Sequence, residues 1–243
     1  MPSLATLLNM YSAMLESLGP SHWWPGETPF EVSVGAILTQ NTNWGNVERA
    51  IANLSRHDLL DPVKLFQMDS RKLAELIRPA GYYRIKASRL QNFLLFLREE
   101  AGFRFSALEK YDTEELRRKL LGVKGIGAET ADSIVLYALH KPSFVVDAYT
   151  TRIFSRHGVV PESIGYEELR SLFMETLPCN VSLYQEYHAL LVRTGKRWCR
   201  KKYGLCSDCP LYLYTDAGGG EDLRQWHAEA FRENKGAKRQ SNC

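Results

Sequence analysis

Apolar residues recur along most of the chain at intervals of three and four positions, the period of an amphipathic α-helix. The clearest runs follow the capping-box segment TPFE at 28–31, the turn at Gly81 and the segment DTEEL at 112–116. Their core-facing positions are expected to be Phe30, Val34, Ile37 and Leu38 in the first run, and Ile85, Leu90, Phe93, Leu94 and Leu97 in the second. No sustained alternation with a period of two occurs, so the pattern predicts an all-α fold.

Two segments depart from this pattern. SFVVD, at 143–147, resembles a strand but is short and lies between two helical patterns, so we interpret it as a buried crossover. After Cys209 the chain becomes polar, and GGG at 218–220 opens a tail. In this tail, 221–233 is compatible with a short helix and 234–243 is expected to be disordered.

The composition is that of an ordinary soluble protein. Of the 243 residues, 44% are hydrophobic and 24% are charged, and no apolar run is long enough to span a bilayer. The N-terminal segment lacks a basic leader and carries leucines at helical spacing, so it predicts an amphipathic helix and not a signal peptide. We therefore expect a cytoplasmic protein without membrane contact.

The net charge of +3 is too small to indicate a polyanionic partner, but its distribution is informative. KRWCRKK at 196–202 holds five basic residues, and RRK at 117–119 directly precedes a glycine-rich turn. Either cluster alone is typical of a solvated face. Together with the turn that follows, they favour contact with phosphates.

The glycine-rich turn is GIG at 125–127, between helical patterns at 113–121 and 128–139. Two glycines around one apolar residue allow a tight turn whose amides point the same way, and the following helix adds its positive N-terminal end. Most such turns only reverse the chain. Here the flanking helices, at about 113–139, favour a helix-hairpin-helix that grips the nucleic-acid backbone without reading its sequence.

The segment LLGVKGIGAETADSIVLYALHKPSFVVDAYTTRIFSRHG at 120–158 resembles the hairpin and active-site region of the endonuclease III superfamily of DNA glycosylases, also called the helix-hairpin-helix-GPD superfamily. GAILTQNTNW at 35–44, GYYRIKA at 81–87 and the cysteine loop after 199 are similar to other signatures of the family, in the same order. The resemblance covers about residues 1–214. Glu129, HWWPGETPFE and Trp44 are most similar to the branch that removes 3-methyladenine.

The resemblance implies two helical domains with a DNA-binding cleft between them. We expect one domain at 29–140 and a second made of 1–28 and 141–215, with a cysteine loop at 199–215 and a polar tail at 216–243. The partner would be damaged double-stranded DNA, bound by a nucleoid-associated monomer with the target nucleotide flipped out of the stack. The expected backbone contacts are Lys124, Gly125, Gly127, Lys196, Arg200 and Lys201, with a monovalent cation at the hairpin.

Asp147 stands where the family carries its essential aspartate, eighteen residues after Glu129. A carboxylate there would stabilise the positive charge that develops on the sugar and would orient or deprotonate the attacking water. Asp147 also has the sequence context of a cap for the helix that follows, and the two roles are compatible. In the bifunctional members the position of Glu129 is a lysine that forms a Schiff base, and a carboxylate cannot do so. Glu129 is nevertheless a second candidate catalytic residue, which would add electrostatic attraction for a cationic base or position a neighbouring group.

The resemblance assigns Trp24, Pro25 and Trp44 to the base pocket, where aromatic faces suit a cationic alkylated purine. It assigns Gln40 and Tyr82 to filling the gap and wedging the DNA after the nucleotide has flipped. The alternatives are that the tryptophans are core anchors, Gln40 a turn amide and Tyr82 an exposed aromatic side chain.

Cys199, Cys206 and Cys209 form the pattern C-x6-C-x2-C, which resembles the [4Fe-4S] site of the family. The position of the fourth cysteine is Thr215, so this ligand is missing. Three outcomes are open: another ligand such as Asp216 completes the cluster, a three-cysteine cluster forms, or the loop has lost its metal.

These features predict a monofunctional DNA glycosylase of base excision repair that hydrolyses the glycosidic bond of an alkylated purine such as 3-methyladenine. AP-lyase activity is expected to be weak or absent. The alternatives are a uracil or thymine mismatch glycosylase and, from a different class, a non-catalytic DNA-binding helix-hairpin-helix protein.

Overall fold

The computed structural model describes residues 2–214, which form two compact units. One unit is Trp24–Val145, and the other joins the residues up to Trp23 with those from Val146 onward. The boundaries expected from the sequence were 28/29 and 140/141. Over the described residues the chain is helical, with an isolated bridge between Cys199 and Gly204 in place of any strand. None of the described helices is long and apolar enough to cross a membrane.

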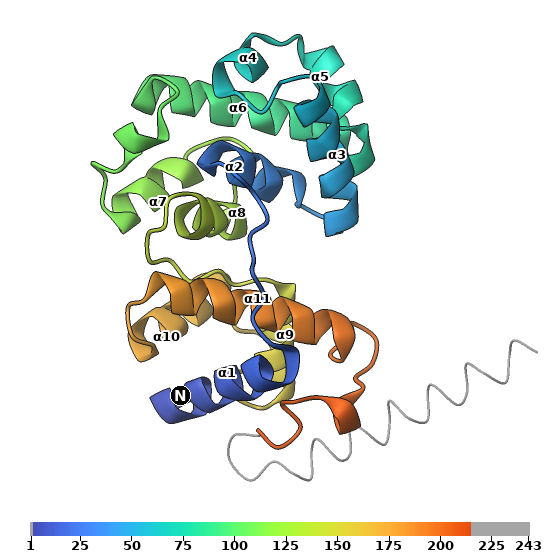
Figure 1. The fold of residues 1–243 in the computed structure, drawn as a ribbon. Coiled ribbons are helices and arrows are strands. Elements are labelled where there is room, and N and C mark those ends of the chain that lie inside the picture. Colours follow the sequence, from blue (N-terminus) through green and yellow to red (C-terminus); the bar gives the residue numbers. More distant parts are fainter. Residues whose placement is uncertain (1, 215–243) are drawn as a thin grey trace, which may run out of the picture. The chain divides into compact units, whose positions relative to one another are not determined.

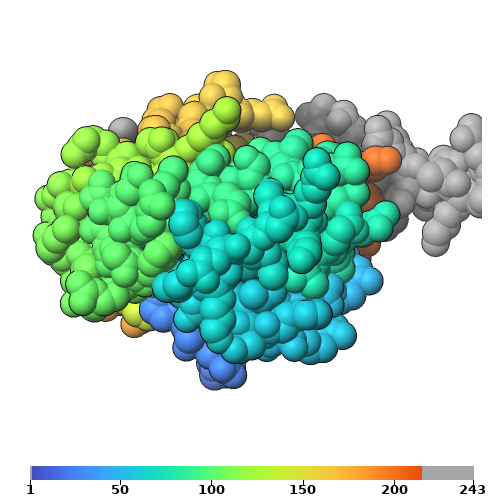
Figure 2. All heavy atoms as spheres, turned by 90° about the horizontal axis from the view of Figure 1, so that it is seen from above, coloured from blue at the N-terminus to red at the C-terminus, as the bar shows by residue number. Residues whose placement is uncertain are grey.

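The unit Trp24–Val145 is built around one short central helix (Figure 1). Helix α2 (Pro29–Leu38) packs against helices from several sides and buries eight of its ten residues. The remaining helices of the unit are α3 (Trp44–Arg56), α4 (Pro62–Gln67), α5 (Ser70–Leu76), α6 (Tyr83–Ala101), α7 (Thr113–Leu121) and α8 (Ala128–Ser133). Helices α4 and α5 pack on α6, and α6 packs on α2. Segments 60–110, cyan to green in Figure 2, cover the face of this unit seen there.

Local signals explain where these helices begin. Thr28 Oγ1 accepts a hydrogen bond from Glu31 N at 3.1 Å, as the capping box predicts. The carboxylate of Glu31 accepts from Glu27 N and not from the cap residue itself.

One predicted core position is wrong: Ile85 is 54% exposed, because it lies in the first turn of α6 before the helix reaches the core.

The second unit contains α1 (Leu4–Leu18), α9 (Ala148–Arg156), α10 (Tyr166–Thr176) and α11 (Val181–Arg197). Helix α11 packs on α1 and α9, and its Tyr187 hydroxyl donates to Leu7 O at 2.8 Å. The ring of Phe173 lies edge-on to Phe154 at 4.9 Å and to Tyr187 at 5.7 Å, so aromatic packing joins three helices. The predicted helix at 221–233 and the predicted disorder of 234–243 lie outside the described residues.

Residues 143–146 form the buried, non-helical crossover that the sequence predicted. Their side chains are at most 2% exposed, although they belong to no strand. The segment leads from the π-helical turn Ile134–Ala138, which extends α8, to α9.

Candidate functional site

The hairpin turn connects α7 to α8 as the glycine pattern predicts. Gly125 has φ +97°, a backbone conformation that favours glycine, whereas Gly127 is extended and caps α8. Val123 and Ile126 are buried and anchor the turn, while Lys124 and Gly127 are exposed. The turn therefore presents backbone groups and one lysine to the solvent.

A buried ion pair holds the two helices of the hairpin together. Arg117 on α7 donates from Nε and Nη2 to the carboxylate of Asp132 on α8, at 2.8 and 3.1 Å, and Ser143 Oγ also donates to Asp132. Arg117 is 7% exposed, so it is not a phosphate contact as the basic RRK cluster suggested. Lys119, from the same cluster, is paired with Glu100 at 3.1 Å.

Gln40, predicted to fill the gap in the DNA, lies just after α2 and is tied to the hairpin. Its Nε2 donates to Gly125 O at 3.1 Å and to Thr130 Oγ1 at 2.9 Å. Its Oε1 accepts a hydrogen bond from Arg89 Nη1 on α6. Gln40 and the hairpin thus form one hydrogen-bonded group, as a turn amide would, and the role of Gln40 in filling the gap stays a prediction.

Tyr82, predicted to wedge the duplex, is 69% exposed at the start of α6. Its φ of +46° lies in the left-handed region, which is uncommon for a residue with a large side chain, and it follows Gly81 at φ +69°. This turn holds an aromatic side chain out in the solvent, where packing alone would not place it.

An aromatic cluster surrounds Trp24 within the unit Trp24–Val145. The indole of Trp24 meets Trp44 edge-on, with ring centroids 5.3 Å apart, and Tyr137 at 5.3 Å with a tilt of 55°. Gly35 on α2 makes room for this indole, because a Cβ there would lie 3.1 Å from Trp24 Cζ2. Trp24 and Trp44 are half-buried and Pro25 is exposed, so the cluster has an open side.

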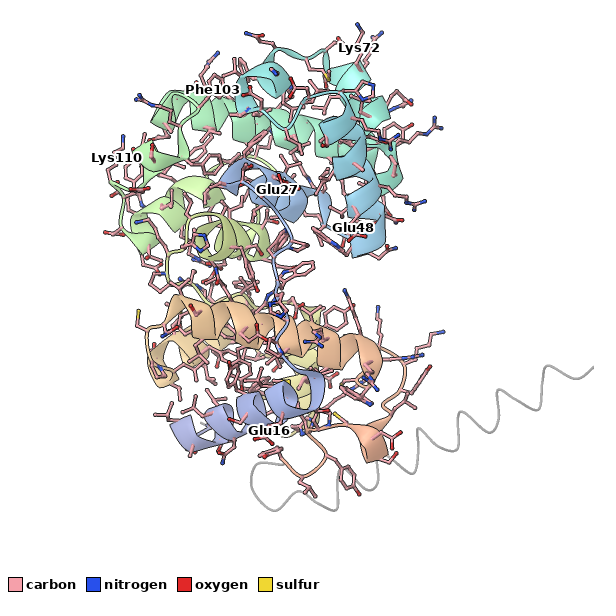
Figure 3. The ribbon with its side chains drawn as sticks, in the orientation of Figure 1. Glu16, Glu27, Glu48, Lys72, Phe103 and Lys110 are labelled. Carbon is pink, nitrogen blue, oxygen red and sulfur yellow. The ribbon has the colours of Figure 1, made fainter. Side chains whose placement is uncertain are left out.

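The indole of Trp44 is held by Glu48, which Figure 3 labels on α3. Trp44 Nε1 donates to Glu48 Oε1 at 2.6 Å, one helical turn further on. Tyr137 was not predicted, because an aromatic residue within an apolar run is more often part of the core, and its 4% exposure agrees with that. Its ring contact with Trp24 places it in the aromatic cluster.

Glu129 lies exposed in the first turn of α8, where the positive N-terminal end of the helix stabilises a carboxylate. Its backbone carbonyl accepts a hydrogen bond from Ser133 Oγ at 2.7 Å. An acid at this place has a local structural reason, and it excludes an amine nucleophile from the position.

Asp147, in the other unit, uses its two carboxylate oxygens differently. Oδ1 caps α9 and accepts from Tyr149 N, Thr150 N and Thr150 Oγ1 at 2.9, 2.7 and 2.9 Å. Oδ2 faces His188 Nε2 on α11 at 3.8 Å, longer than a hydrogen bond but close enough for attraction to a protonated imidazole. His188 was missed, because a lone histidine on the buried face of an amphipathic helix gives no sequence signal.

The environment keeps the Asp147 carboxyl charged. Burial by itself would raise its pKa, but the imidazole of His188 and the hydrogen bonds from Thr150 outweigh burial and lower the pKa below the ordinary value of 3.8. At neutral pH the group is therefore a carboxylate, suited to stabilising positive charge or accepting a proton.

The cysteine loop follows α11. Cys199 is buried, and Cys206 and Cys209 are half-buried, where burial and the neighbouring cysteines raise the pKa of Cys206 to about 12 and that of Cys209 to about 11. Over residues 2–214, no three His, Cys, Asp or Glu side chains are grouped so as to hold a metal ion. The described cysteines thus do not form a complete site by themselves, and Thr215 and Asp216 lie outside the described residues.

Arginines of α9 hold this loop in place. Arg156 donates to the carbonyls of Arg200 and Lys201 at 2.7 and 2.9 Å, and its Nη1 lies 3.3 Å from Cys199 Sγ. Arg152 Nε donates to Cys199 O at 2.8 Å. The side chains of Lys196, Arg200 and Lys201 remain exposed, as contacts to phosphates require.

Comparison with known proteins agrees with this arrangement. A protein of Methanocaldococcus jannaschii, provisionally named a DNA repair glycosylase, is 52% identical over 206 residues, which cover 84% of this chain and 93% of that protein. The Helicobacter pylori 3-methyladenine DNA glycosylase MagIII, in a crystal structure with 1,N6-ethenoadenine, is 30% identical with a TM-score of 0.67, covering 81% of this chain and 98% of that chain. A non-covalent endonuclease III–DNA complex has the same fold, with a TM-score of 0.76, 20% identity and coverage of 92% and 100%.

The family model for HhH-GPD superfamily base excision DNA repair proteins matches residues 34–179, which contain the hairpin, the aromatic cluster except Trp24, and Asp147. The chain therefore belongs to the HhH-GPD superfamily and is a DNA glycosylase of that superfamily.

Proposed function

We propose that this glycosylase removes an alkylated purine such as 3-methyladenine from double-stranded DNA and has little or no AP-lyase activity. The observation that carries the proposal is the half-open cluster of Trp24, Trp44 and Tyr137. Alkylation at a ring nitrogen makes a purine cationic, and aromatic faces attract a flat cation more than a neutral base. The similarity to MagIII, a 3-methyladenine DNA glycosylase, supports the same substrate class.

The chemistry assigned to Asp147 is hydrolysis. The bond between C1′ and the purine nitrogen breaks, and both electrons leave with the base, which becomes neutral. The Asp147 carboxylate stabilises the positive charge left on the sugar, and water adds at C1′ and releases a proton to the carboxylate or to solvent. Trp24 and Trp44 would hold the base, and Lys124, Gly125, Gly127, Lys196, Arg200 and Lys201 the DNA backbone.

The test is release of free base from duplexes that each carry one defined lesion. We expect release of 3-methyladenine and none of uracil or mismatched thymine. Release of uracil or thymine would favour the mismatch glycosylases instead. Absence of turnover on every lesion would leave a DNA-binding protein without chemistry.

Asp147→Asn should reduce excision at least about 100-fold while DNA binding is preserved, because an amide cannot supply the negative charge. The fold should survive, because asparagine caps helices as well as aspartate does. Asp61→Asn is the matched control, since Asp61 caps α4 through Val63 N and Lys64 N in the same way. Retained excision by Asp147→Asn would refute the mechanism.

The absence of lyase activity has a separate test. Borohydride should trap no covalent complex between the enzyme and DNA, because Glu129 cannot form an imine. If trapping is efficient, Lys124→Ala will show whether that exposed lysine supplies the amine.

The iron–sulfur cluster and the hairpin cation also belong to the proposal, as structural elements only. Cys199, Cys206 and Cys209 are not grouped as metal ligands over the described residues, so holding a cluster would require these thiols to draw together with a further ligand. The cluster would then stiffen the basic loop against the DNA. Iron and sulfide analysis of protein made with ample iron tests this, and Cys206→Ser should lose both. In the hairpin turn, Lys124 O and Gly125 O already accept hydrogen bonds from the amides of Asn92 and Gln40.

A further inference from the structure

Three polar side chains lie at intervals of three along α6 and bond to three different turns. They are Lys86, Arg89 and Asn92, which we call the α6 stripe. Residues at this spacing share one face of a helix. The turns to which they bond are the ones that carry Tyr82, Gln40 and the hairpin.

Lys86 is 1% exposed, and its ammonium donates to Leu38 O at 2.8 Å and to Ala80 O at 2.7 Å. Leu38 ends α2 two positions before Gln40, and Ala80 stands two positions before Tyr82. One buried cation therefore fixes the chain ahead of both residues that are expected to enter the DNA.

Arg89 lies between Gln40 and the hairpin. Its Nη1 donates to Gln40 Oε1, while its aliphatic stem lies against Gly125, where a Cβ would come within 2.4 Å of Arg89 Cγ. Asn92 Nδ2 donates to Lys124 O at 2.8 Å, one position earlier in the same turn. Guanidinium groups can only donate, so Arg89 fixes which end of the Gln40 amide is the acceptor. The Nε2 end must then face Gly125 O and Thr130 Oγ1, as it does.

We propose that Arg89 is a positioning residue that holds Gln40 in register with the hairpin, so that gripping the backbone and filling the gap left by a flipped nucleotide act as one step. The proposal rests on the gap-filling role that the family resemblance implies for Gln40, but not on the identity of the excised base. Arg89 acts through Gln40 and touches no reacting atom.

The test uses Arg89→Met, which keeps most of the stem against Gly125 and removes the guanidinium. Binding is measured to a duplex with a stable abasic-site analogue and to the same duplex without it. We expect the affinity for the abasic duplex to fall about tenfold, the worth of one hydrogen bond to a charged group, and the affinity for the intact duplex to change as little as in the control. The control is Arg98→Met, which removes the same charge from the same helix at a site that contacts Phe66.

A double-mutant cycle with Gln40→Leu separates positioning from general loosening of the fold. If Arg89 acts through Gln40, the double variant will bind the abasic duplex no worse than Gln40→Leu alone. 2-Aminopurine placed beside the abasic site reports unstacking of the DNA by an increase in fluorescence. This increase should be reduced to the same extent in Arg89→Met, Gln40→Leu and the double variant. Arg89→Lys, which retains a donor and the charge, should recover part of the loss, and it replaces Arg89→Met in the cycle if that variant does not fold.

Additive losses in the cycle, or equal losses on both duplexes, would overturn the proposal. Because no base is excised in these measurements, a positive cycle would stand even if methylated DNA proved not to be a substrate. Conversely, release of 3-methyladenine together with an additive cycle would support the proposed function and remove Arg89 from it.

Discussion

The side chain of Asp147 both caps α9 and faces the imidazole of His188. The cap of α9 depends on residues two and three positions further on, so it could be predicted from the local sequence. The facing imidazole of His188 comes from α11, and no local pattern indicates it. Arg117 also shows what the local sequence does not indicate. Its charge predicted a surface contact, and only the fold reveals its buried partner Asp132.

Lys86 should give the stability of the protein a measurable pH dependence. Burial, with a smaller contribution from Arg89, lowers the pKa of Lys86 from 10.5 to about 8. The unfolded chain therefore binds more protons between about pH 8 and 10.5, so the contribution of Lys86 to stability rises with pH across this range and is lost as pH falls through 8. Relative to Lys86→Met, the wild type should gain about 2 kcal/mol in free energy of unfolding between about pH 7.5 and 9.5.

Urea denaturation of both proteins at the two pH values measures this difference, and the comparison cancels the titration of other groups. Lys72→Met, at an exposed lysine of α5, is the control and should show no such change. A constant difference between wild type and Lys86→Met would mean that Lys86 stays charged in its site.

At the scale of elements, α7 and α8 should depend on the pair between Arg117 and Asp132. Removing one partner leaves a buried charge, so Asp132→Asn should lower the free energy of unfolding by about 3–5 kcal/mol. The double change of Arg117→Met with Asp132→Leu should cost less than this single change, because it leaves no buried charge. Chemical denaturation measures both.

The partly exposed pair of Lys119 and Glu100 is the comparison. Lys119→Met should lower the free energy of unfolding far less than Asp132→Asn, because solvent screens this pair. Equal effects of Asp132→Asn and Lys119→Met would show that burial does not set the strength of the first pair.

The hydrophobic pattern predicted most helices of the fold, because an amphipathic helix is a local feature. It did not predict that α2 is buried all round, since a ten-residue run with one clear apolar face looks like a surface helix until its neighbours are known. The π-helical turn at Ile134–Ala138 was also missed, because its spacing depends on packing. Of the site, the turns and the capping aspartate were predictable, whereas the α6 stripe and Tyr137 depend on contacts between elements.

At the scale of the whole molecule, both units should contribute to binding DNA through phosphates. Lys124→Ala in one unit and Lys201→Ala in the other should each reduce the slope of log affinity against log salt by about 0.9, the value for one phosphate contact. The two effects should add, because the lysines share no partner. Titration of a fluorescent duplex at several salt concentrations measures the slopes.

Lys72→Ala serves as the control for this experiment as well, since Lys72, labelled in Figure 3, lies on α5 away from the hairpin turn. A slope that Lys201→Ala leaves unchanged would mean that the basic loop after α11 does not touch the backbone. A slope that Lys124→Ala leaves unchanged would place the hairpin contacts on backbone amides alone.

The three hydrogen bonds that fix Oδ1 of Asp147 have a consequence for the rate of the reaction. A flexible carboxylate in water must reorient, with its solvation shell, as positive charge appears on the sugar. In the mechanism proposed above, the folding of α9 has already set the orientation of this carboxylate, so we expect little reorganisation energy in the chemical step, with Oδ2 preorganised for the transition state.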